Sequence, residues 1–78
     1  MNDVYSDVRR RAEALSRLGF FDHSKALTDA MAEGSTGTEI LMMLRHRLHM
    51  AIEDGKIPSS EHANLRSLYQ QIDIILST

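Results

Sequence analysis

The chain has 78 residues, a formal net charge of −2 and no cysteine. The lack of cysteine excludes disulfides and thiolate metal sites, and it favours a cytoplasmic location. No apolar run approaches the roughly 20 residues that a membrane-spanning helix needs. The slightly acidic balance argues against nonspecific nucleic-acid binding. We therefore expect one helical-bundle domain over residues 1–78 that binds neither membrane nor nucleic acid.

The first predicted helix starts near Asp3, a good N-cap residue, and runs to Leu18, with Gly19 as its stop. Its apolar positions follow the helical period and share one face. The run Arg9–Arg11 is the densest group of like charges in the chain. This run fits a solvated helix face whose cations pair with nearby carboxylates. It also fits a docking surface for an acidic partner, to which Arg10 would contribute.

A short second helix is predicted over Asp22–Glu33, with Asp22 as its N-cap and Gly34 as its end. Phe20 and Phe21 lie in the connection before it. Because aromatic side chains bury large areas, we expect this pair to close one end of a bundle. The alternative is that an exposed Phe20 anchors an interface.

The third predicted helix, Thr36–Asp54, has clear start and stop signals. Its first residues fit a capping box, in which the Thr36 hydroxyl accepts from the third helical N–H and the Glu39 carboxylate accepts from the N–H of the cap residue. Gly55 is predicted to close the helix in the left-handed conformation. At about 100° per residue, six apolar residues fall within one arc that faces the core. They are Ile40, Leu41, Leu44, Leu48, Ala51 and Ile52.

Met43 and Met50 lie outside this arc, seven residues apart and beside Arg47 and Asp54. The third helix is therefore apolar on one full face and partly apolar on a second. Methionine commonly fills irregular gaps in a core, which favours packing against several neighbouring helices. The other interpretation is that the methionine strip meets a partner.

The last helix is predicted to begin after Pro58, with Ser59 or Ser60 as its N-cap. Its apolar stripe is dense, and Ile74 points away from it. Short connections favour antiparallel neighbours. The predicted fold class is all-α: a small antiparallel bundle of four helices, three longer and one short. Four side chains from the last two helices are expected to be buried together: Leu44, Leu48, Leu68 and Ile72.

His46 and His49 stand three residues apart, close enough to share one metal ion. They supply at most two ligands, however, and Arg45 and Arg47 oppose a cation beside them. The pattern of a zinc protease is absent. A general acid or base also needs a pocket and an orienting partner, which a bundle this small rarely encloses. We therefore predict no metal, no cofactor and no catalytic residue.

The turn Ser35–Thr38 precedes a helix, where free N–H groups can hold an anion. It lacks the lysine of a phosphate-binding loop, and Glu39 would repel an anion, so capping is the preferred interpretation. The same first turn offers no basic or amide side chains to base edges, which argues against a DNA-binding helix-turn-helix.

These features favour a noncatalytic protein–protein interaction module, a physical type that includes bacterial inhibitor, immunity and regulatory-adaptor proteins. The expected partner is another protein or a second copy of the chain. The alternative is a small-ligand or anion-binding domain that uses the Ser35–Thr38 helix N-terminus, with Arg45 nearby. The candidate partner-binding residues are Met43, His46, Arg47, Met50 and Arg10.

Overall fold

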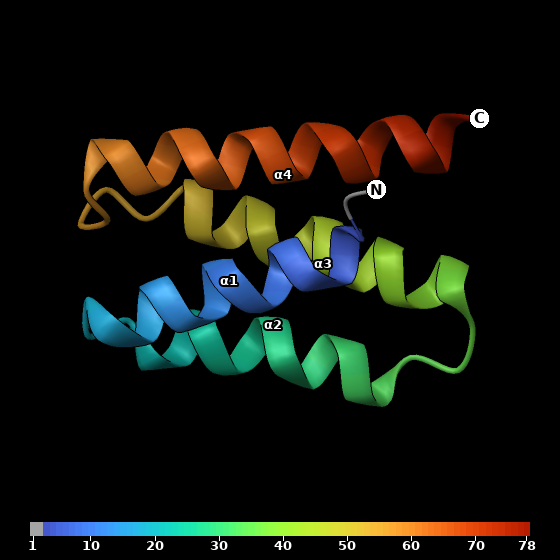
Figure 1. Cartoon of the computed structure of the whole chain (residues 1–78), viewed down its shortest axis with the longest axis horizontal. Helices are drawn as coiled ribbons and strands as arrows, with labels where there is room; N and C mark the ends of the chain where they lie inside the picture. The colour runs from blue at the N-terminus through green and yellow to red at the C-terminus, as the bar shows by residue number, and fades with distance from the viewer. Residues whose placement is uncertain (1–2) are drawn as a thin grey trace.

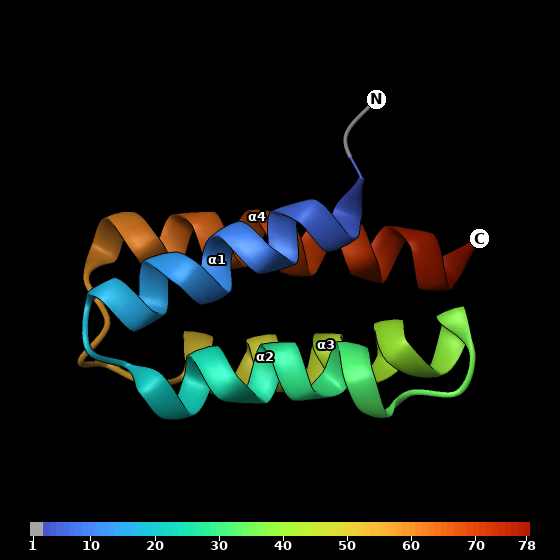
Figure 2. The same ribbon diagram turned by 60° about the horizontal axis from the view of Figure 1, so that its bottom comes forward.

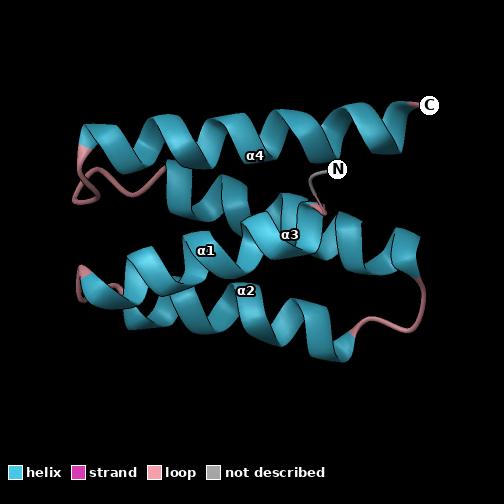
Figure 3. Cartoon of the chain, viewed as in Figure 1, coloured by secondary structure: helices cyan, strands magenta, loops and turns pink. Residues whose placement is uncertain are grey.

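The computed structural model describes residues 3–78 and shows four α-helices. They are α1 (Val4–Arg17), α2 (Phe21–Glu33), α3 (Gly37–Ile52) and α4 (Ser59–Ser77). Figure 3 shows these helices joined by loops, with no strand in the part of the chain described. The predicted all-α fold is confirmed. The second helix, predicted to be short, has 13 residues, only one fewer than the first helix with 14.

The four helices run alternately in opposite directions (Figure 1). The α1–α2 and α3–α4 connections lie at one end of the bundle, and the α2–α3 connection lies at the other. Helix α1 packs on α2 and α4, and α3 packs on the same two helices. Figure 2 shows α1 and α4 in one layer above α2 and α3. Helices α1 and α3 therefore occupy opposite corners, and their outward faces point in opposite directions.

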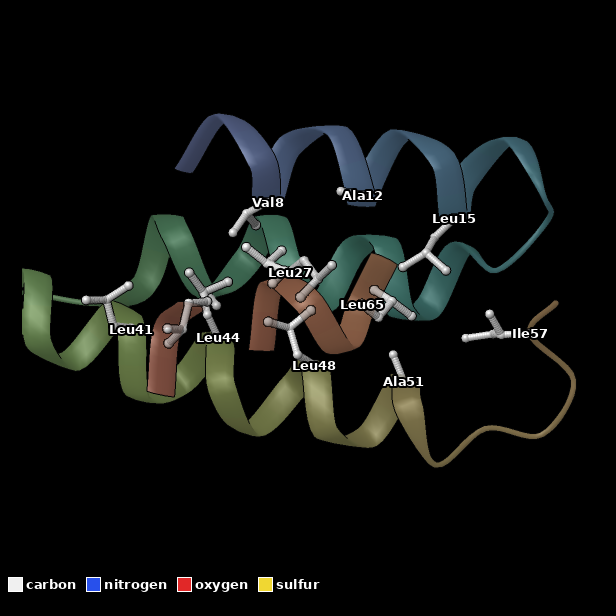
Figure 4. Close-up of a cluster of buried hydrophobic side chains, with 13 residues drawn as sticks. Val8, Ala12, Leu15, Leu27, Leu41, Leu44, Leu48, Ala51, Ile57 and Leu65 are labelled. Atoms are coloured by element: carbon white, nitrogen blue, oxygen red, sulfur yellow. The ribbon is translucent and has the colours of Figure 1, made fainter. Parts of the chain in front are cut away.

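The core lies between the four helices, and all of them contribute to it. The four side chains expected to be buried together are at most 3% exposed, which confirms the assignment of the inner faces of α3 and α4. Figure 4 shows Leu44 and Leu48 of α3 pointing towards the same interior as Leu15 of α1. Each buried leucine contributes about 1.5–3 kcal/mol through removal of its surface from water.

Helix α1 has the ends that its sequence predicts. The Asp3 side chain accepts a hydrogen bond from the Tyr5 N–H at 3.0 Å. At the other end, Gly19 has a φ of 91°, the left-handed conformation that glycine adopts without steric cost. The Phe20 N–H donates to the Leu15 carbonyl and the Gly19 N–H donates to Ser16. This pair of bonds is a Schellman motif, which satisfies the last carbonyls of the helix.

The start of α2 differs from the prediction. Phe20 holds the N-cap position without a side-chain bond, and Asp22 lies inside the first turn, so its assignment as N-cap is wrong. The turn at Gly19 brings Phe20 against the core, and the Ser24 N–H then bonds its carbonyl. Phe21 consequently points outwards and is 66% exposed. One phenylalanine, not two, closes this end of the bundle.

Gly34 ends α2, as predicted, but its role there is to allow close packing and not to adopt the left-handed conformation. Its backbone is extended, with a φ of −69°, and is not left-handed. A Cβ atom at this position would overlap Cγ1 of Ile40 on α3. The glycine therefore allows the α2–α3 connection to approach the first turn of α3 closely.

The α3–α4 connection is organised by Asp54 and not by glycine. Helix α3 ends at Ile52, and Gly19 is the only glycine with positive φ among residues 3–78, so the left-handed closure predicted at Gly55 is wrong. Asp54 lies past the helix end, where its carboxylate accepts from the Lys56 N–H at 3.0 Å and forms a local turn. Pro58, not a serine, then occupies the N-cap position of α4.

Candidate interaction surface

The outward face of α3 carries four side chains that we call the outer strip: Met42, His46, His49 and Met50. Met42 is 53% exposed and Met50 is 55% exposed, and both histidines are exposed as well. Residues four apart on a helix are neighbours on its surface. The steps from Met42 to His46 and from His46 to Met50 therefore make one continuous ridge over two turns.

The two methionines predicted for this surface have different environments. Met43 is half-buried and packs against the core, whereas Met50 is exposed. Met42, which the sequence analysis did not single out, shares the exposed face. The periodicity contained the signal for it, because Met42 precedes Leu44 by two residues and so lies roughly 200° around the helix from that core position.

Arg47 is held by α2. Its Nη1 donates to the Ala26 carbonyl at 2.7 Å, and its Nη2 lies 3.3 Å from Oε2 of Glu33. The Arg47 side chain is 26% exposed. Arg47 therefore borders the strip as a link between helices α2 and α3.

Arg45 makes the corresponding link on the other side of α3. Its Nη1 lies 2.8 Å from Oδ1 of Asp73 on α4. The two arginines that flank His46 in the sequence thus diverge to the two neighbouring helices. Between them the outer strip has no cation of its own unless a histidine is protonated.

The structure does not bring Arg10 to this surface. Arg10 lies on α1, where its Nη1 is 3.4 Å from Oδ1 of Asp7 and its side chain is 67% exposed. It lines a groove between α1 and α4 together with Asn64 and Gln71. Since α1 and α3 occupy opposite corners of the bundle, Arg10 and the outer strip face different directions.

A shallow hollow borders the outer strip on the side of α4. It has a volume of about 330 Å³ and is lined by Met42, Arg45, His46, His49 and Tyr69. The rings of His49 and Tyr69 are tilted with centroids 6.4 Å apart, within the usual range for aromatic pairs. We call this feature the α3–α4 hollow.

The helix N-terminus considered as an anion site is engaged by its own side chains. The Thr36 hydroxyl accepts from the Glu39 N–H at 3.1 Å, and the Glu39 carboxylate accepts from the Ser35 N–H at 3.3 Å. The second bond comes from the residue before the cap, one position earlier than in a capping box. Arg45 points to α4 and contributes no charge to this turn.

A second polar cluster lies at the end of the bundle that holds the Phe20 turn. His23 Nε2 is 2.9 Å from Oδ2 of Asp54, and His62 Nε2 is 2.9 Å from the Asp54 carbonyl. The pKa of Asp54 is lowered from its ordinary value, first by the hydrogen bond from the Lys56 N–H and then by the bond with His23. Asp54 thereby ties α2, the connection and α4 together.

Within residues 3–78, no three His, Asp or Glu side chains form a group that could hold a metal ion. None of the four helices combines the length and apolar character that a bilayer crossing requires. Comparison with protein-family models, with curated proteins and with solved structures finds no significant match. The arrangement of side chains is therefore the basis for the functional proposal.

Proposed function

We propose that this chain is a noncatalytic protein–protein interaction module whose partner docks on the outer strip of α3. The observation that carries the proposal is the exposure of Met42 and Met50 on one ridge, two turns apart. Methionine side chains are flexible and polarisable, so they adapt to the contours of a partner. Methionine is also enriched where protein interfaces bury their centres.

The charges around the strip support a specific kind of partner. Glu39 lies three residues before Met42, and Glu53 lies three residues after Met50. Both glutamates are exposed. The two carboxylates therefore stand roughly 20 Å apart along the helix axis, one past each end of the outer strip. A helix or extended segment with apolar residues at its centre and Lys or Arg towards both ends would complement this surface. A bacterial inhibitor, immunity or regulatory-adaptor role fits a module of this physical type.

The test replaces both exposed methionines. Met42→Glu with Met50→Glu should keep the circular-dichroism spectrum, because neither side chain belongs to the core, and should abolish partner capture or convert a dimer to a monomer. Affinity capture and light scattering measure the two possibilities. Ile74→Glu is the matched control, since Ile74 is 64% exposed on the outer face of α4. Unchanged binding in the double variant, or loss of binding in the control alone, would refute the proposal.

A further inference from the structure

The outward face of α4 carries no charged side chain. Opposite the four buried residues of this helix lie six exposed side chains, none of them ionisable. Charged residues make up 26% of the chain, so a solvated face of this length would be expected to include some. Charged residues are depleted where protein interfaces bury their centres. We call these six residues the α4 face: Ser60, Ala63, Ser67, Gln70, Ile74 and Ser77.

The spacing of the α4 face is that of a helix that pairs with another helix. Its members are separated alternately by three and four residues, the spacing of the contact positions in a coiled coil. Ile74 is 64% exposed, and α4 runs along one edge of the bundle (Figure 1). The face is therefore open to a helix of another chain.

The α4 face is complementary to a second copy of itself in the antiparallel orientation. With a two-fold axis midway along the face, Ile74 lies opposite Ala63 of the second copy. The isoleucine side chain then fills the space beside the short alanine side chain. Next to the axis, the Gln70 amide lies opposite the Ser67 hydroxyl, and the two groups can form a hydrogen bond. The large and polar side chains thus each meet a suitable neighbour.

The charges at the edge of the α4 face favour the same pairing. Apart from the buried Glu61, the charged residues of α4 are Arg66 and Asp73, seven residues apart on the edge nearer α3. Asp73 is bonded to Arg45 through Oδ1, yet its side chain remains 49% exposed. The two-fold axis brings this edge of both copies together, as in antiparallel coiled coils. Arg66 of one copy then stands within about 3 Å of Asp73 of the other along the helix axis, whereas like charges stand further apart.

We propose that the chain forms a two-fold symmetric dimer in which the α4 faces of two copies pack antiparallel. This inference goes beyond the proposed function and does not depend on it, because the outer strip lies on α3. The partner of the outer strip is then a different protein, to which the dimer offers two docking surfaces. An interface along a single helix is small, so the dimer dissociates on dilution.

Sedimentation equilibrium over a series of chain concentrations tests the oligomeric state. The wild type should approach the mass of two chains at high concentration. Ile74→Glu should remain a monomer, because it buries a carboxylate against Ala63 of the second copy, and should keep its circular-dichroism spectrum. Phe21→Glu is the matched control, since Phe21 is 66% exposed on α2, and should still dimerise. A monomeric wild type, or an Ile74→Glu variant as dimeric as Phe21→Glu, would overturn the proposal.

An exchange of charges tests the antiparallel orientation. Arg66→Asp and Asp73→Arg should each weaken the dimer about tenfold at low ionic strength, because each replaces two opposite-charge pairs by two like-charge pairs. An equimolar mixture of the two variants should recover wild-type affinity, since every pair in the mixed dimer again joins opposite charges. Loss of the bond to Arg45 is the same in the mixture, so damage to the fold alone would not be recovered. A mixture no tighter than its components would overturn the pairing.

The same assays separate this dimer from the proposed function. Ile74→Glu keeps the outer strip and should still capture the partner protein, whereas Met42→Glu with Met50→Glu should lose the partner and remain a dimer. Light scattering therefore reports on the α4 face and affinity capture on the outer strip. Dissociation of the dimer by the two methionine substitutions, with Ile74→Glu still dimeric, would overturn this inference and leave the interaction proposal standing.

Discussion

Glu61 is the one charged side chain buried among residues 3–78, and it is 6% exposed. Nη1 of Arg11 lies 2.8 Å from one carboxylate oxygen and 3.1 Å from the other, and the Asn64 amide donates at 3.3 Å. These bonds compensate the carboxylate for its loss of water and tie α1 to α4. Arg11 therefore differs from Arg9 and Arg10, its exposed neighbours in the basic run.

The pair predicts an asymmetric response to substitution. Arg11→Met should lower the free energy of unfolding by about 3 kcal/mol, because it leaves a buried carboxylate without its cation. Glu61→Met should cost less, since Arg11 is 23% exposed and its freed guanidinium group can reach water. The double variant should recover most of the loss. Urea denaturation measures all three, and equal, additive losses would show that the two side chains are not coupled.

The environment of Asp54 predicts that its contribution to the stability of the fold is lost at acidic pH. Because hydrogen bonds to Lys56 and His23 lower its pKa in the folded chain, its contribution to stability is complete above its ordinary pKa. That contribution is lost as the pH falls through the lower, folded-state value. The difference in urea midpoint between the wild type and Asp54→Asn should therefore shrink below about pH 4. A difference that stays constant from neutral to strongly acidic pH would contradict this role.

At the scale of the elements, sequence reasoning succeeds where a boundary depends on residues close together in the chain. The caps at Asp3 and Thr36 involve hydrogen bonds that span two and three residues, and the Gly19 turn is equally local. These boundaries can be predicted from the sequence because the residues that cap a helix lie next to its end in the chain.

Distant contacts are a second source of error. Asp54 carries a negative charge, which is unfavourable at the C-terminal end of a helix. Contacts with His23, 31 residues away, and with His62 of α4 nevertheless make it the centre of the α3–α4 connection. The bond from Arg11 to Glu61 spans 50 residues. Periodicity identifies which face of a helix is buried, but it does not identify which helix will supply a polar partner.

The N-cap of α3 provides a testable prediction about helix stability. Thr36→Ala should lower stability by about 1 kcal/mol, because the Glu39 N–H loses its acceptor, and should leave partner binding intact. Thr38→Ala is the control, since Thr38 is exposed in the first turn and does not occupy the cap. Thermal or urea unfolding measures the stability of both variants. Equal stability of both variants would mean that the hydroxyl bond contributes nothing.

For the whole molecule, the cyclic order of the helices decides which candidate residues can act together. His46 and Met50 share a face of α3, Met43 partly joins the core, and Arg47 is bonded to α2. Arg10 lies at the opposite corner. The helical period predicts a second, partly apolar face on α3. The period marks Met42 as outward, roughly 200° from Leu44, but it does not show that Met43, about 100° from Leu44, is partly covered, because packing against neighbouring helices determines that.

The central claim is that the outward face of α3 contacts the partner, and site-specific photo-crosslinking tests it most directly. A photoreactive amino acid replaces His46 in one variant and Glu13, exposed on the outward face of α1, in another. Neither substitution disturbs the core. After irradiation in the cells that produce the chain, position 46 should give a covalent adduct of higher mass and position 13 should give none. An adduct from position 13 with none from position 46 would contradict the account.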